Sequence, residues 1–279
     1  MLKKVTVRKS PSYLSTYKLP LLSFKLHSKL PQSIRTVWEA LNHGDAAMAR
    51  QLAASALSEK RLYAASECAA LKVGLAAAEW SLGSVQNARR HAGHALDLFP
   101  AQWSSHRILL ASHCSKRAFK AAYLHLENLE STGPVPTWDE PVSLVEREVA
   151  LAAWSWMLGE WEKVAMHLQA AYPAGISIMP AQLQEDWLRL SLYRDKPDDA
   201  AAAAALLIET RPADLTDELL QTIVQNGWTK QALPLYRRAF KSEPGNPLLR
   251  RRLVALCIRE GEIEEARLLT KPGALSMAA

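Results

Sequence analysis

Five histidines and a cysteine near the middle of the chain are the residues whose types could bind a metal. They are His91, His94, His106, His113, Cys114 and His125. His91 and His94 are three residues apart, so on a helix they share a face, as pairs of zinc ligands do. No pattern of carboxylates accompanies them to orient the imidazole rings. The sequence therefore favours solvated or packed histidines and predicts neither a metal nor a cofactor.

Pairs of carboxylates are the second candidate for chemistry, because two acids on one face can act as general acid and base. The pairs here are Glu146 with Glu148, Asp198 with Asp199, and Glu264 with Glu265. Residues this close in sequence face different directions on a helix. The chain also lacks the common phosphate-binding, dinucleotide-binding, serine-hydrolase and zinc-protease motifs. We predict no catalytic residues and a protein that is not an enzyme; a divergent enzyme would need a closed pocket with strongly shifted pKa values.

The elements that carry these residues are helices. In residues 75–100, LAAAEWSLGSVQNARRHAGHALDLFP, two amphipathic patterns meet at Gly83 and the second ends at Pro100. Glycine ends a helix in the left-handed conformation without a Cβ penalty, and alanine lets two helix backbones approach closely. The segment predicts a helix, a turn and an antiparallel helix. Such a unit buries its apolar face only against copies of itself.

Copies of this unit recur along the chain. Gly227 and Gly261 are 34 residues apart, as are Ala232 and Ala266, and Pro244 closes the first of these two copies. The sequence predicts an all-α fold of about seven hairpins over residues 31–270. Turns are predicted near Gly44, Gly83, Arg117, Gly159, Asp195, Gly227 and Gly261. The dense run of Pro and Gly in residues 131–141, STGPVPTWDEP, predicts a loop or hinge.

These residues resemble the tetratricopeptide repeat, a helical hairpin of 34 residues with small residues at fixed positions and a closing proline. The resemblance rests on Leu75, Ala76, Gly83, Ala88, Ala92, Ala95 and Pro100. The resemblance implies a right-handed α-solenoid whose first helices line a concave groove. It also implies that certain positions of those helices point into the groove. According to the resemblance, the partner-binding residues at these positions are Trp80, Arg107, Cys114, Trp156, Met157, Arg189, Tyr193 and Arg251.

Aromatic, methionine and arginine side chains are typical of a surface that binds peptides. The alternative is that the tryptophans and methionines at helical spacing belong to the core. The function that follows from the resemblance is a non-catalytic scaffold or adaptor that captures a protein or peptide partner in the concave groove. A place in bacterial assembly or secretion machinery is a hypothesis that rests only on the breadth of the family.

Residues 1–30 differ from the repeats and form a predicted basic arm. Residues 1–36 contain eight basic residues and no acidic residue. The rest of the chain therefore contains 26 basic and 28 acidic residues. The high pI therefore belongs to the arm, and nucleic-acid binding by the repeats is not expected. The arm is read as a solvated segment, with docking on a partner and organellar targeting as alternatives. Binding of nucleic acid or an anionic surface through this arm is the alternative function.

The remaining expectations concern the C-terminus and the compartment. Residues 271–279 are a predicted tail, and few residues follow Gly261 to form a polar capping helix. The last hairpin is therefore either covered by a partner or by a second copy of the chain, or capped by its own charged residues. No stretch is long enough to span a membrane. The cysteines Cys68, Cys114 and Cys257 form no CxxC pair, which favours a reducing compartment and a cytoplasmic location.

Overall fold

The structure is a computed structural model that describes residues 12–18, 30–59, 63–129, 138–209 and 220–271. All regular secondary structure in these residues is helical, and none of them lies in a strand, which confirms the predicted all-α class. The chain divides into two compact units. Tyr17–Glu160 form one, called here the α2–α8 unit, and Met1–Thr16 with Trp161–Ala279 form the other, the α9–α15 unit. The predicted boundaries of the arm, the repeats and the tail stay predictions.

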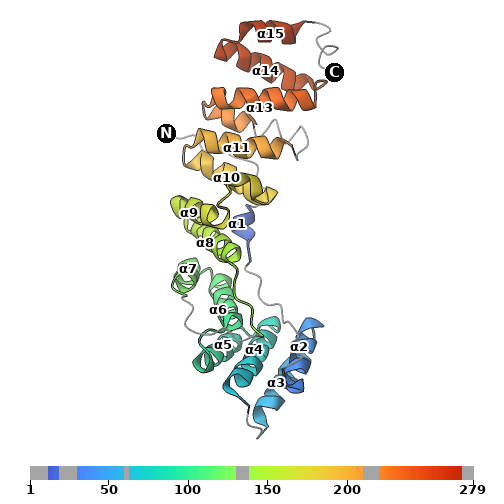
Figure 1. Cartoon of the computed structure of the whole chain (residues 1–279), viewed down its shortest axis with the longest axis vertical. Coiled ribbons are helices and arrows are strands. Elements are labelled where there is room, and N and C mark those ends of the chain that lie inside the picture. The colour runs from blue at the N-terminus through green and yellow to red at the C-terminus, as the bar shows by residue number, and fades with distance from the viewer. Residues whose placement is uncertain (1–11, 19–29, 60–62, 130–137, 210–219, 272–279) are drawn as a thin grey trace. The chain divides into compact units, whose positions relative to one another are not determined.

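The α2–α8 unit is a series of helices in which neighbours along the chain pack against each other (Figure 1). Its helices are α2 (Gln32–Asn42), α3 (Ala46–Ser58), α4 (Ala65–Ser81), α5 (Val85–Leu98), α6 (Trp103–Ser115), α7 (Phe119–Glu127) and α8 (Leu144–Leu158).

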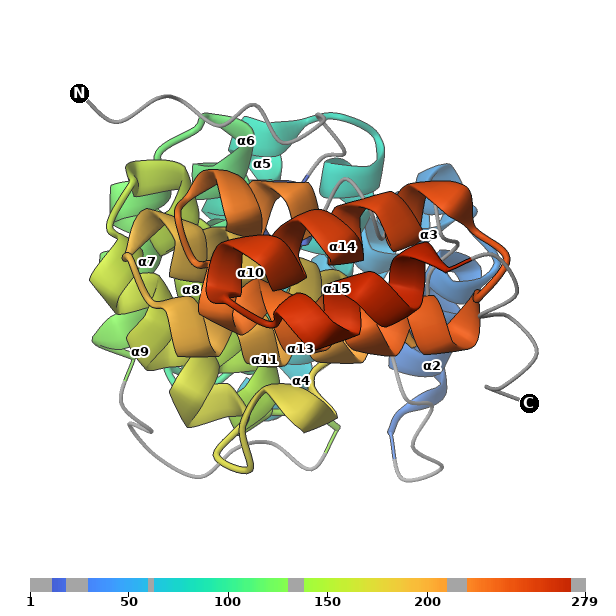
Figure 2. The same ribbon diagram turned by 90° about the horizontal axis from the view of Figure 1, so that it is seen from above.

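The α9–α15 unit has the same design, and Figure 2 shows its last pair, α14 and α15, side by side. Residues 220–225 are also helical and precede α13. The labelled helices are α9 (Trp161–Ala171), η1 (Ile176–Ile178), α10 (Ala181–Tyr193), α11 (Pro197–Ile208), α13 (Thr229–Ser242), α14 (Pro247–Glu260) and α15 (Ile263–Thr270). One further short helix, α1 (Tyr13–Thr16), packs against α10 in this unit.

The turns between helices adopt the left-handed conformation at each residue where a turn is predicted. Five of these residues are glycines, and Arg117 (φ 56°) and Asp195 (φ 55°) take the same conformation without being glycine. At Arg117 the backbone N–H groups of residues 117 and 118 donate to the carbonyls of Cys114 and His113, both at 2.9 Å. These bonds satisfy the last carbonyls of α6. The 34-residue period therefore locates the turn even where the glycine is missing.

The core of the α2–α8 unit relies on small residues where helices cross. Ala76 and Ala77 of α4 and Ala88 and Ala92 of α5 are buried in one cluster. Gly74 lies where α4 crosses α2, and a Cβ atom placed there would be 2.7 Å from Val37 Cγ1. Because real Cβ contacts are longer than this, the glycine is required for the close approach of the two helices.

The described end of the predicted loop before α8 is anchored in the α2–α8 unit. The Trp138 ring meets the Trp38 ring edge-on, with centroids 5.3 Å apart and 62° between the planes. Asp139 accepts hydrogen bonds from the Ser104 backbone N–H at 3.1 Å and from the Ser104 hydroxyl at 2.5 Å. Ser104 is in the first turn of α6, so Asp139 caps that helix from 35 residues away.

Candidate functional site

The histidine cluster forms a hydrogen-bonded chain between α6 and α7. His106 Nε2 lies 2.9 Å from the Pro100 carbonyl oxygen, which can only accept, so this nitrogen carries the proton. His106 Nδ1 then accepts from His125 Nε2 at 3.1 Å. Burial, followed by the nearby His106 and His113, lowers the pKa of His125 to about 4. Burial also lowers the pKa of His106, both of whose ring nitrogens have protein partners, so His106 and His125 form a neutral packed pair at pH 7.

No group of three or more potential metal ligands is found among the residues that the structure describes. The cluster also lies outside both of the surface pockets described below. Its chemical consequence is therefore a dependence of stability on pH, because charging the rings in the folded protein is unfavourable.

Three of the predicted groove residues in the α2–α8 unit are engaged in internal packing. Trp80 is partly buried against the alanine cluster of α4 and α5. Arg107 is 8% exposed and pairs with Glu146 at 3.7 Å. Cys114 is half-buried in the cluster around Leu110, and burial raises its pKa to about 11, so the thiol stays protonated. All three side chains thus have partners within the unit, and a role in partner binding stays a prediction for each of them.

Two further predicted residues, Trp156 and Met157, are at the C-terminal end of α8. Trp156 is partly buried, whereas Met157 is 42% exposed. Met157 is thus the most accessible of the five predicted groove residues in this unit.

Arg189 and Tyr193 lie on α10 and differ in their surroundings. Arg189 pairs with Glu185 at 3.3 Å and with Asp186 at 3.4 Å, and only 12% of its side chain is exposed. Tyr193 is 66% exposed and stacks on Trp161 of α9, with ring centroids 4.9 Å apart and 4° between the planes. The stack gives α10 an exposed aromatic surface at its C-terminal end.

Asp186 is a functional candidate that sequence reasoning missed. Its side chain is fully buried, and its Oδ2 accepts a hydrogen bond from the Leu14 backbone N–H at 2.8 Å. The Ser12 hydroxyl donates a second hydrogen bond to the carboxylate. Burial raises the pKa of Asp186 to about 6, while the hydrogen bonds from Leu14 and Ser12 and the charge of Arg189 act in the opposite direction.

Asp186, Arg189 and Tyr193 share one face of α10, because they are spaced by three and four residues. At 1.5 Å per residue, Tyr193 is about 10 Å along the helix from Asp186. The face defined by these three residues is called the α10 face below. It is covered by α1 at Asp186 and open at Tyr193.

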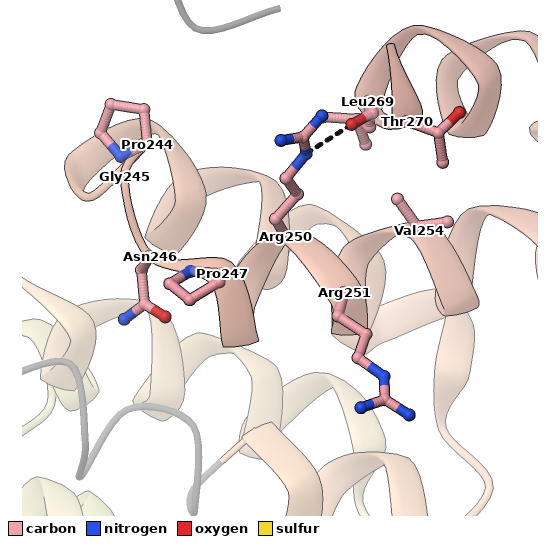
Figure 3. A pocket seen from close by; sticks show the side chains of 9 residues that line it. All are labelled: Pro244, Gly245, Asn246, Pro247, Arg250, Arg251, Val254, Leu269 and Thr270. Atoms are coloured by element: carbon pink, nitrogen blue, oxygen red, sulfur yellow. Dashed lines mark hydrogen bonds between the residues drawn. The ribbon is translucent and has the colours of Figure 1, made fainter. Parts of the chain in front are cut away.

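Arg251 lines a pocket of about 470 Å³ between the start of α14 and the end of α15 (Figure 3). Arg250 forms one wall, where its Nε donates to the Leu269 carbonyl at 2.5 Å and its Nη2 to the Lys271 carbonyl at 3.0 Å. The Arg251 side chain points away from Leu269 and Thr270 (Figure 3). Nearby, Ile258, Ile263 and Leu268 of the last hairpin are all more than two-fifths exposed. Coverage of this end by a partner or by a second copy of the chain stays a prediction.

A second pocket, of about 460 Å³, is formed by α9, η1, α10 and α11. Tyr172, Met179 and Trp187 give it apolar walls, and Asp199 contributes a carboxylate. The Trp187 indole N–H is buried without a hydrogen-bond partner. The volume of this pocket lies within the range of pockets that hold a small ligand.

The fold and the face of α10 together define a helical-hairpin repeat protein with a surface that holds a short segment. Residues 224–276, which include α13, α14 and α15, match the family model of the Tetratricopeptide repeat. This match confirms the resemblance inferred from the 34-residue period, and proteins with this repeat generally mediate contacts between proteins. No curated protein matches the chain. Among the described residues, no helix has both the length and the apolarity that crossing a bilayer demands.

Proposed function

We propose that the protein is a non-catalytic scaffold or adaptor that binds a partner segment on the concave wall of a right-handed solenoid of about seven helical hairpins. The family match over residues 224–276 supports the repeat assignment for the C-terminal hairpins. The left-handed turns at all seven predicted positions support the same unit along the rest of the chain. Partners from bacterial assembly or secretion machinery remain a hypothesis, to be tested by identifying what is captured.

The observation that carries the proposal is the contact of α1 with α10. The helix α10 is the first helix of a predicted hairpin. It binds α1, a short segment that lies outside the predicted hairpins. The segment is held by one buried apolar side chain, Leu14, and by hydrogen bonds to its backbone and hydroxyl group. These are the interactions by which a groove holds an extended or helical peptide.

Site-specific photo-cross-linking tests the proposal. A photoreactive phenylalanine analogue is placed at Tyr193, on the α10 face, or at Met166 of α9, which is 52% exposed and belongs to the second helix of its predicted hairpin. The proposal predicts that Tyr193 captures a defined protein in the native host and that Met166 does not. Capture of the same proteins from both positions, or of none from Tyr193, contradicts it.

A further inference from the structure

We propose that Ser12–Thr16 is a tethered ligand of the α10 face, and that the partner of this face presents the same chemistry: a Ser or Thr at the start of a helical turn, followed two residues later by a leucine. This inference rests on the proposed function and names the kind of segment that the face binds. The partner must displace the tethered segment to reach Asp186.

The backbone at the start of α1 is hydrogen-bonded both to its own Ser12 and to Asp186 of α10. The first turn of a helix leaves backbone N–H groups without partners. The Ser15 N–H donates to the Ser12 hydroxyl oxygen at 3.2 Å, which is an ordinary N-cap. The Leu14 N–H instead donates to Asp186, 172 residues away. The Ser12 hydroxyl takes part in both interactions, because it accepts a hydrogen bond from the Ser15 N–H and donates one to the Asp186 carboxylate.

The residues at the start of this segment are buried to different extents. Leu14 is 1% exposed and Ser12 is 8% exposed, whereas Tyr13 between them is 36% exposed. Ser12 and Leu14 are therefore buried, whereas Tyr13 is only partly covered. The burial of the first and third residues defines the recognised pattern as a hydroxyl residue followed two residues later by leucine.

The short helix α1 is ordered by its contact with α10. A helix of four residues is far shorter than an isolated helix needs to be stable in water. The contact with α10 therefore provides the energy that orders the segment. Another segment with the same groups can make the same hydrogen bonds, so docking is a competition rather than a fixed feature of the core.

The α10 face continues beyond the part that α1 covers. Tyr193 lies about 10 Å farther along α10 and is 66% exposed, with its ring on Trp161. A partner segment longer than α1 can occupy Asp186 and also contact this aromatic pair. That additional contact allows a partner to outcompete the tethered segment, whose advantage is its high effective concentration.

The test uses the full chain and a synthetic peptide with the sequence of residues 10–18, SPSYLSTYK, observed by NMR at up to millimolar concentration. Leu14→Asp releases the chain's own α1, because it puts a second carboxylate beside Asp186. Leu14→Ala is a milder variant for the same purpose, and circular dichroism verifies folding. We expect both variants to bind the peptide at least tenfold more tightly than the wild type. Adding Asp186→Ala to Leu14→Asp should weaken binding at least tenfold.

Equal peptide affinity for the wild type and both folded Leu14 variants overturns the inference. So does the absence of binding to either variant, or binding that Asp186→Ala does not change. A control peptide with alanine in place of its leucine should not bind, and binding equal to that of the original peptide also counts against the proposal. Capture of a partner at Tyr193 without peptide binding would leave the proposed function standing and refute only the tethered ligand.

Discussion

The Leu14 backbone N–H donates a 2.8 Å hydrogen bond to Asp186 Oδ2, across 172 positions of the sequence. The bond gives a buried carboxylate a partner and at the same time caps a helix too short to stand alone. It connects the beginning of the described chain to the face of α10 that also carries Arg189 and Tyr193.

The ionisation of Asp186 gives the first prediction. Burial raises its pKa in the folded protein to about 6, above its ordinary value, so the folded state holds this proton more tightly than the unfolded state. The contribution of Asp186 to the free energy of unfolding should therefore increase as the pH falls from about 7 to 4, by about 1–3 kcal/mol. Chemical denaturation of wild type and Asp186→Asn across this range measures the difference. The exposed Asp198→Asn serves as control, and an identical pH trend in wild type and Asp186→Asn refutes the prediction.

His125 gives a prediction of opposite sign in the α2–α8 unit. Burial and the neighbouring His106 and His113 lower its pKa to about 4, so the unfolded state binds the proton more tightly. The free energy of unfolding of this unit should decrease by about 2 kcal/mol as the pH falls from 6.5 to 4. His125→Gln should flatten that decrease in urea titrations, with the more exposed His43→Gln as control. A steeper loss of stability in His125→Gln than in wild type would count against the network.

Gly74 tests the close approach of α2 and α4. Alanine in place of glycine ordinarily stabilises a helix interior by about 1 kcal/mol. Here the added Cβ would meet Val37 Cγ1 at 2.7 Å, so we expect Gly74→Ala to destabilise the protein by about 1–3 kcal/mol.

The control for this variant is Gly93→Ala in α5, where the added Cβ has no neighbour within 4 Å, and which should stabilise. In the Val37→Ala background, Gly74→Ala should cost clearly less than in the wild type, since the clashing methyl group is gone. A fully additive double-mutant cycle would show that the two residues do not meet.

Arg117 tests the turn that lacks glycine. A side chain at φ 56° is strained, so Arg117→Gly should raise the free energy of unfolding by up to about 1 kcal/mol. The adjacent Lys116 has φ −92°, and Lys116→Gly should lower it instead, because glycine gains freedom in the unfolded chain. Thermal unfolding followed by circular dichroism distinguishes the two, and a lower melting temperature for Arg117→Gly contradicts the assigned turn.

Local features of the fold were predictable because they repeat in the sequence. The period of 34 residues locates the turn at Arg117 from the glycine at Gly83, and the match over residues 224–276 confirms the family resemblance. The alanines of α4 and α5 are buried where the helices cross, as the pattern indicates. Each of these features depends on residues close together in the chain.

The contacts of the candidate site were not predictable, because they join distant residues and occur once. Nothing in the repeat pattern connects Asp186 to Leu14, or Asp139 to Ser104. The direction of a groove side chain depends strongly on register, because a shift of one residue turns it by about 100° around the helix. The repeat pattern also does not specify that Trp80 packs against the alanine cluster or that Arg107 pairs with Glu146, whereas Tyr193 is exposed.

The most direct test of the account is hydrogen exchange in the segment Ser12–Thr16 of the full chain, followed by mass spectrometry. If α1 is docked on the α10 face, its backbone amides exchange at least tenfold more slowly in wild type than in Asp186→Ala, while α11 and α13 exchange equally in both. Adding the captured partner should remove the protection in wild type. Exchange at the rate of an unstructured peptide in wild type would contradict the central claim, because Asp186 would then hold no tethered segment.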